Sequence, residues 1–169
     1  MTYSSSKLRV ARNSDACLAV NRNSTTGDIV QLNYNGTQRG SISTDGTVIA
    51  FNTSSDYRLK ENAAAITDGI TRLKTLKPYR FNWKSVGVGK TVDGFFAHEL
   101  TAVPEAITGT KDQVTTSSDV SAGIATAVGI PIYQGIDQSK LVPLLTAALQ
   151  ESITKIETLE TKVAALESS

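Results

Sequence analysis

The last part of the chain repeats an apolar residue at alternating intervals of three and four positions, and this heptad constrains the fold most strongly. Such a repeat favours a long helix that buries one narrow seam against other helices in a coiled coil. The a positions are Val142, Leu149, Ile156 and Val163, and the d positions are Leu145, Ser152, Leu159 and Leu166, with the polar Ser152 as the one exception. Residue choice alone leans toward dimers without excluding trimers. An ordinary amphipathic helix packed on its own domain is the alternative.

The sequence also predicts where this helix starts, and that start sets the first residue of the C-terminal segment. Asp137 or Ser139 can accept hydrogen bonds from the first free N–H groups of the helix. Pro143 falls within the first turn, where its missing N–H is tolerated. We therefore expect residues 137–169 to form the coiled-coil helix.

The first third, residues 1–54, is predicted to be rich in β-strands. Asn35-Gly36 and Asp45-Gly46 are strong hairpin signals, because both residues of such turns tolerate positive φ. The apolar positions that mark the strands are Leu18, Val20, Ile29, Val30, Leu32, Tyr34, Val48, Ile49 and Phe51. Strands this short give one copy little core, whereas three copies wound about an axis would cover the apolar faces.

Residues 55–136 change character and predict a small α+β segment. A helix is expected at Ile66, Ile70, Leu73 and Leu76, capped by Thr67 and stopped by Pro78. A strand over 79–83 should be followed by a turn at Gly87, Gly89 and Asp93-Gly94 and a second strand over 95–97. We also expect a short helix or turn over 103–107, a loop over 109–123, and a short strand at Ile130, Ile132 and Tyr133.

Composition argues against several classes of partner and cofactor. The net charge of +1 gives no reason to expect nucleic acid, and no apolar run approaches the roughly 20 residues of a membrane span. Cys17 is the one cysteine and His98 the one histidine, so no disulfide within the chain and no metal site are expected. The run 87–91 resembles the end of a phosphate-binding loop, but a strand is expected after it instead of a helix, so we expect no cofactor.

The chemistry-bearing segment is the polar run 53–62, at the junction between the strand-rich and mixed parts. Ser55 can act as a nucleophile with Lys60 as its general base, provided that the lysine amine is neutral. Asp56, Arg58 and Asn62 add a carboxylate, a second cation and an amide that can support the pair. Residues five apart do not share one face of a strand or helix, so the pair needs either a bend after Ser55 or a lysine from a neighbouring chain. A turn followed by a solvated charged face is the simpler interpretation of these residues alone.

Four blocks in this order resemble the C-terminal intramolecular chaperone, or auto-processing, domain of bacteriophage tail spikes and tail fibres, including endosialidase tailspikes. They are residues 55–62, 73–83, 94–100 and 141–145, the last directly before the heptad helix. The resemblance covers the chain from about Ser54 to its end. It divides the chain into a stalk end, 1–54, and a chaperone domain, 55–169.

The resemblance implies a trimeric domain that helps an upstream triple-stranded β-stalk to fold and then cuts itself off. The cut implied here is the Ser54–Ser55 peptide bond, with Ser55 as nucleophile and Lys60 as general base. His98 and Glu99 match a family block and are candidate supporting residues. The expected partners are two further copies and the stalk of the same polypeptide. The precursor would fold in the bacterial host cytoplasm, and the stalk would belong to the virion tail.

Two other functions compete with this one. The domain could instead be a permanent fibre-tip adhesin that binds a host receptor through the loop 109–123 and is never cut. A serine hydrolase acting on other molecules is disfavoured, because the sequence lacks a nucleophile elbow.

Overall fold

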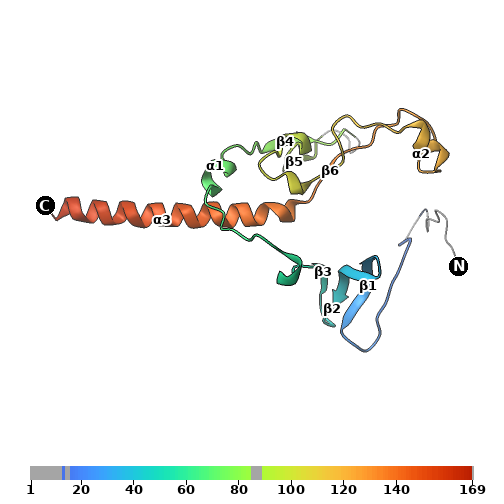
Figure 1. The fold of residues 1–169 in the computed structure, drawn as a ribbon, viewed down its shortest axis with the longest axis horizontal. Coiled ribbons are helices and arrows are strands. Elements are labelled where there is room, and N and C mark those ends of the chain that lie inside the picture. The colour runs from blue at the N-terminus through green and yellow to red at the C-terminus, as the bar shows by residue number, and fades with distance from the viewer. Residues whose placement is uncertain (1–12, 14–15, 85–88, 169) are drawn as a thin grey trace. The chain divides into compact units, whose positions relative to one another are not determined.

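The computed structural model describes residues 13, 16–84 and 89–168. The chain divides into two compact units, the first ending at Ala63 and the second beginning at Ala64. The predicted turn glycine Gly87 lies outside the described residues. The architecture is α+β, with small sheets and a long C-terminal helix, as predicted (Figure 1).

The first unit is an antiparallel sheet of three strands in the order β1-β2-β3. These are β1 (Gly27–Tyr34), β2 (Thr37–Thr44) and β3 (Ile49–Thr53). Asn35 and Gly36 turn with φ values of 49° and 75°, as a tight hairpin requires. In the second connection, Asp45 Oδ1 accepts hydrogen bonds from the N–H groups of Thr47 and Val48 at 2.8 and 2.9 Å. Both predicted hairpins are therefore confirmed.

The strand expected around Leu18 and Val20 is wrong, because both residues lie in irregular, exposed chain. An alternation of a few residues needs a partner ladder to become a strand. None of the described strands pairs with this segment.

The two faces of the sheet differ in chemistry. Val30, Ile42 and Phe51 form a row across the strands, and Leu32 and Ile49 share their face. Phe51 is 81% exposed, so the described part of this unit leaves the apolar face largely uncovered. The opposite face is polar and carries Ser41, Ser43 and Asn52, which are joined by side-chain hydrogen bonds.

The second unit is built on the long helix α3 (Leu141–Glu167), with the short helix α1 (Gly69–Leu73) lying against it (Figure 1). Gly69 lets the two backbones approach closely, because a Cβ there would lie 2.6 Å from Ala148 N. The Ile70 N–H also donates to Glu151 Oε2 at 3.0 Å. The predicted helix over 66–76 is therefore too long, and Asp68, not Thr67, is its N-cap residue. The contact with α3 fixes a single turn or so of helix, and the chain leaves it before Pro78.

The hydrophobic core of the second unit is small. Its buried residues are Leu100, Val103, Ala106, Leu141 and Leu144. The 3-10 turn Pro104–Ala106 contributes to it, as the predicted short helix or turn over 103–107 anticipates. The strands are β4 (Tyr79–Asn82) with β5 (Thr91–Gly94), and β6 (Ile107–Thr108) with β7 (Gly135–Ile136).

Three predictions for the middle segment are corrected. The second strand of the hairpin is β5 and not residues 95–97, because Gly94 pairs with Tyr79 and leaves Phe95 free to pack against the core. The expected loop 109–123 contains the helix α2 (Ser117–Ser121), which Thr116 and Asp119 cap reciprocally. Residues 130–133 form no strand beyond one bridge between Val114 and Pro131, and the pairing with β6 falls later, in β7.

The helix α3 carries two different apolar faces. Leu141, Leu144 and Ala148 are buried in the core of their own unit, Leu144 being only 2% exposed. The predicted seam residues Leu145, Leu149, Ile156, Leu159, Val163 and Leu166 are all exposed. Figure 1 shows that the C-terminal half of α3 extends beyond the rest of its unit. The seam is thus not the face with which α3 packs on its own domain. Asp137 caps the 3-10 turn Gln138–Lys140 that leads into the helix, as one of the two expected caps.

No helix in the described part of the chain is both long and apolar enough to cross a membrane. Within the same residues, no cluster of three or more His, Cys, Asp or Glu side chains has an arrangement that could hold a metal ion.

Candidate active site

Ser55 and Lys60 lie in contact within one chain. A 3-10 turn over Tyr57–Leu59 bends the chain directly after Ser55. Lys60 Nζ donates a hydrogen bond to Ser55 Oγ at 2.7 Å. Of the two routes that the spacing left open, the structure shows the bend. The distance is within the range expected of a nucleophile and its general base.

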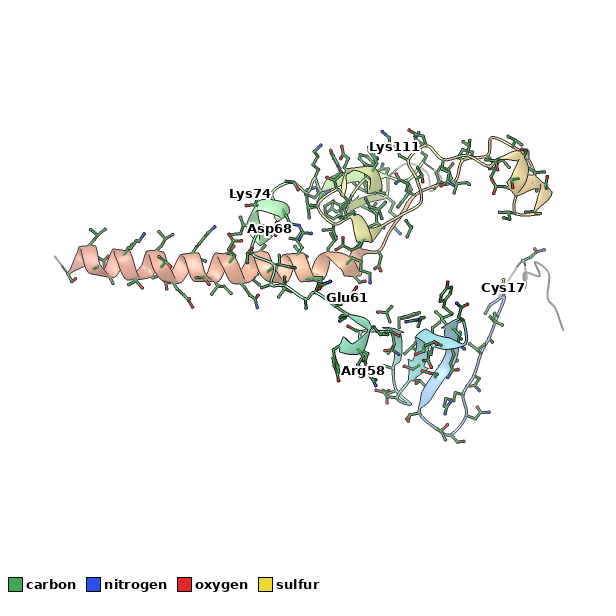
Figure 2. All side chains as sticks on the ribbon, viewed as in Figure 1. Cys17, Arg58, Glu61, Asp68, Lys74 and Lys111 are labelled. Carbon is green, nitrogen blue, oxygen red and sulfur yellow. The ribbon has the colours of Figure 1, made fainter. Side chains whose placement is uncertain are left out.

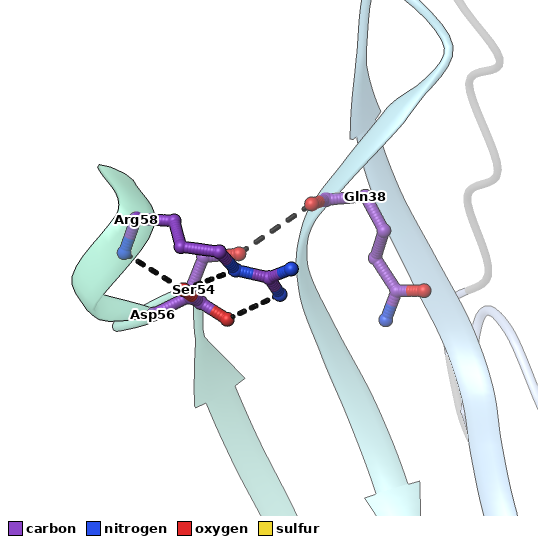
Figure 3. A network of polar contacts seen from close by, with 4 residues as sticks. All are labelled: Gln38, Ser54, Asp56 and Arg58. Atoms are coloured by element: carbon purple, nitrogen blue, oxygen red, sulfur yellow. Dashed lines mark hydrogen bonds and ion pairs between the residues drawn. The ribbon is translucent and has the colours of Figure 1, made fainter.

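The turn is closed by a bidentate ion pair between Asp56 and Arg58. Asp56 Oδ1 accepts from the Arg58 backbone N–H and Nε at 2.8 and 2.9 Å, and Oδ2 accepts from a terminal guanidinium nitrogen at 2.7 Å (Figure 3). The hydrogen bond from the Arg58 side chain is the main cause that lowers the pKa of Asp56, and the charge of Lys60 lowers it further. The same bond raises the pKa of Arg58. Asp56 therefore both caps the turn and stays charged beside the pair.

The residue before Ser55 is held by the sheet. The Ser54 N–H donates to Arg39 O at 2.9 Å, and Ser54 Oγ donates to Gln38 O at 3.4 Å (Figure 3). The Ser54–Ser55 bond thus lies between the end of β3 and the 3-10 turn. Figure 2 shows Arg58 on this turn after the sheet. The bond belongs to the first unit, several residues before the division at Ala63.

The other predicted supporting residues lie in different settings. Asn62 has a φ of 52°, a left-handed conformation that asparagine tolerates better than most residues. Its role is therefore to turn the backbone where the chain continues beyond Lys60. His98 and Glu99 lie in the second unit, on the 3-10 turn Ala97–Glu99. Ser55 and Lys60 lie in the first unit. A supporting role of His98 and Glu99 for these two residues therefore stays a prediction.

His98 and Glu99 have partners within their own unit. The His98 ring stacks on Phe96 with centroids 6.0 Å apart. Glu99 forms an ion pair with Lys77 at 3.4 Å. A hydrogen bond from the Tyr79 hydroxyl is the main cause that lowers the pKa of Glu99, and the same bond raises the pKa of Tyr79. These contacts tie β4 to the turn that follows β5.

Sequence reasoning missed the contribution of β2 to the site. The signal was present in the register of the second hairpin. Gly40 pairs with Thr53, and one further step along an antiparallel ladder brings Arg39 opposite Ser54. Pairing the two strands outward from the Asp45-Gly46 turn would have identified Arg39 as the neighbour of Ser54.

A known protein family matches part of the chain. The family model Peptidase_S74, described as the chaperone of endosialidase, matches residues 55–108. The match begins at Ser55, the residue whose hydroxyl contacts Lys60. No curated protein matches the chain. This match supports an endosialidase-type chaperone domain, from a family named for peptidase activity, over residues 55–108. These residues hold the first three of the four sequence blocks, and the block 141–145 lies outside the match.

Proposed function

We propose that this chain belongs to a phage tail spike or tail fibre, whose chaperone domain assembles three copies, helps the stalk to fold and then cuts the Ser54–Ser55 bond. The observation that carries the proposal is the 2.7 Å contact between Ser55 Oγ and Lys60 Nζ, at the first residues of the matched segment. The resemblance supplies the phage context and the assembly of three copies.

The contact supports a balanced reaction within one chain. Neutral Lys60 takes the proton from Ser55 Oγ, and the oxygen attacks the carbonyl carbon of Ser54. The C–N bond breaks, and the leaving nitrogen takes a proton from the lysine and becomes the α-amine of Ser55. Water then hydrolyses the ester, which releases the Ser54 carboxylate and restores the serine hydroxyl. One cut per chain is the whole activity.

Two uncovered apolar surfaces support assembly with further copies. One is the seam of α3, where Leu149 is 62% exposed, and the other is the sheet face that carries Phe51. Heptad seams of this kind are buried in coiled coils, and contiguous exposed apolar patches mark surfaces that contact other chains. We propose that three copies cover both surfaces, with the seams forming a three-stranded coiled coil.

Removal of the chaperone after folding would make the stalk kinetically stable. Association through α3 aligns the chains before their slow, non-local strand pairing. Once the bond is cut, the stalk can no longer unfold by reversing that aligned route, so its lifetime depends on a high unfolding barrier.

A denaturing gel and an intact mass of the purified chain test the proposal. We expect a fragment that begins at Ser55, and we expect Ser55→Ala and Lys60→Ala to reduce cleavage by at least about a thousandfold. Glu61→Gln, a neighbouring change outside the pair, is the matched control and should cleave normally. A wild-type chain that stays intact, or a fragment with another first residue, would contradict the proposed cut.

One observation favours an uncut adhesin as the second candidate. A shallow hollow of about 220 Å³ lies in the second unit and is lined by His98, Lys111, Gln113 and Tyr133, among others. Figure 2 shows Lys111 in the segment between β6 and α2, in the region predicted to contact a receptor. An intact wild-type chain that binds host cells, with binding lost in Tyr133→Ala, would favour this candidate over self-cleavage.

A further inference from the structure

We infer that the segment of β2 from Gln38 to Gly40 is a positioning element for the cut. It holds Ser54 on the folded sheet, so that the Ser54–Ser55 bond breaks only after β2 and β3 have paired. The inference rests on the proposed self-cleavage, and it extends the site to residues that precede the matched segment 55–108.

The two sides of the bond are held by different structures. On the acyl side, Ser54 donates its N–H to Arg39 O at 2.9 Å and its hydroxyl to Gln38 O at 3.4 Å. On the other side, the 3-10 turn brings Lys60 to Ser55. The attacked carbonyl therefore depends on β2 for its position, whereas the nucleophile and base depend on the turn.

Small residues in β2 allow β3 to come close just before the bond. Gly40 is buried, and a Cβ there would lie 2.7 Å from the Asn52 carbonyl oxygen. Asn52 Nδ2 also donates to Ser41 Oγ at 3.2 Å and to Ser43 Oγ at 2.7 Å. A side chain at Gly40 would push β3 away from β2 two residues before Ser54.

The anchor also depends on β1. Gln38, whose carbonyl accepts from Ser54, donates its side-chain amide to Asp28 Oδ2 at 2.9 Å. Gln31 donates to the same oxygen at 3.3 Å. The position of Ser54 thus responds to the pairing of all three strands, which are the last described strands before the bond.

The effect on rate follows from the geometry of attack. A serine oxygen reacts when it lies about 3–3.5 Å from an aligned carbonyl carbon, and a misplacement of about 1 Å can slow a reaction about a hundredfold. An unpaired Ser54 samples many positions, and few of them present its carbonyl to Ser55. Pairing with β2 restricts those positions before the chemistry begins.

The test uses two variants of the full chain that break the anchor in different ways. Gly40→Val forces the strands apart, and Ser54→Pro removes the N–H that donates to Arg39. Thr47→Ala, in the same turn, is the matched control, because Thr47 is exposed and its backbone N–H, which donates to Asp45, is retained. Amide exchange reports the β2–β3 pairing, far-UV circular dichroism reports α3, and gels and intact mass report cleavage.

We expect both test variants to cleave at least about tenfold more slowly than wild type, and Thr47→Ala to stay within about twofold. The rise of the cleavage rate with pH should keep its wild-type shape in Gly40→Val, because the turn that holds Ser55 and Lys60 is untouched. Wild-type rates in either test variant, or a changed pH profile, would overturn the inference. A wild-type chain that is not cut at all would instead defeat the proposed function together with the inference.

Discussion

The two units of this chain are stabilised in different ways. Every residue of the described hydrophobic core lies in the second unit, around Leu100 and Leu144. Among the described residues of the first unit, Gly40 and Ser41 are buried, and the contacts are mainly ladder and side-chain hydrogen bonds. Hydrogen bonds contribute modestly to net stability, whereas buried apolar surface is the main driving force. The difference predicts that the second unit folds more independently than the first, whose apolar face the proposed further copies would cover.

The largest expected effect concerns the seam through which the second unit would gather copies. Ile156→Asp should convert the assembly to monomers, because a buried Ile side chain contributes about 1.5–3 kcal/mol and the change is repeated in every copy. Sedimentation velocity would measure the oligomeric state. Thr158→Asp, on an exposed polar position of the same helix, should leave the assembly intact. An Ile156→Asp chain that still forms trimers would show that the seam is not the interface.

The next effect separates the core face of α3 from its seam. Leu144→Ala should lower the free energy of unfolding of the second unit by about 2–5 kcal/mol, because it leaves a cavity beside Leu100 and Leu141. Denaturant unfolding followed by circular dichroism would measure this loss, with the exposed Gln150→Ala as control. Equal stability of the two variants would mean that the second unit lacks an independent core.

A smaller effect should reveal the dependence of the sheet on copies. Phe51→Ala should change the stability of a monomeric chain by less than about 0.5 kcal/mol, because the ring is 81% exposed there. In the assembled chain the same change should destabilise the stalk by more than about 1 kcal/mol per copy. The comparison can be made by amide exchange on the background of Ile156→Asp and of wild type. The same small effect in both backgrounds would contradict burial of this face.

The smallest effect is a pH dependence confined to the sheet. Hydrogen bonds from Ser41, Gln38 and Gln31 lower the pKa of Asp28 from its ordinary 3.8, with Ser41 as the largest cause. Because the pKa of Asp28 is lower in the folded chain, its carboxylate stabilises the fold fully above about pH 3.8. This stabilisation is lost as the pH falls through the pKa of the folded chain. Amide exchange of β1 and β2 between pH 5 and pH 2 should therefore show weaker acid destabilisation in Asp28→Asn than in wild type. The same pH dependence of amide exchange in both proteins would show that Asp28 does not cause the acid destabilisation of the sheet.

The sequence predicts most of what depends on local pattern. The hairpin at Asn35-Gly36, the long helix after Asp137 and the Ser55–Lys60 pair follow from turn chemistry, heptad spacing and residue type. What the sequence does not predict depends on partners distant along the chain. The length of α1 is fixed by the approach of Gly69 to Ala148, a contact between separate segments that periodicity does not show.

The same limit explains the error at the middle hairpin and the omission at the site. Phe95 belongs to a loop and not to a strand because the core around Leu100 is available to it. The anchoring of Ser54 required a strand register, which a list of reactive side chains does not contain. The contact between Ser55 and Lys60 was therefore easier to predict than the backbone contacts of Ser54.

The place of Ser54 in the ladder has a consequence for the proposed fibre. A cut on its far side leaves the stalk ending at a residue whose N–H and hydroxyl are bonded to β2. Exopeptidases need a loose, extended end to begin degradation, and such a terminus offers none. A cut several residues later, at the division near Ala63, would leave a frayed tail on every chain. Cleavage at Ser54–Ser55 would thus trim the stalk to its last paired residue, and the particle would need no further processing enzyme.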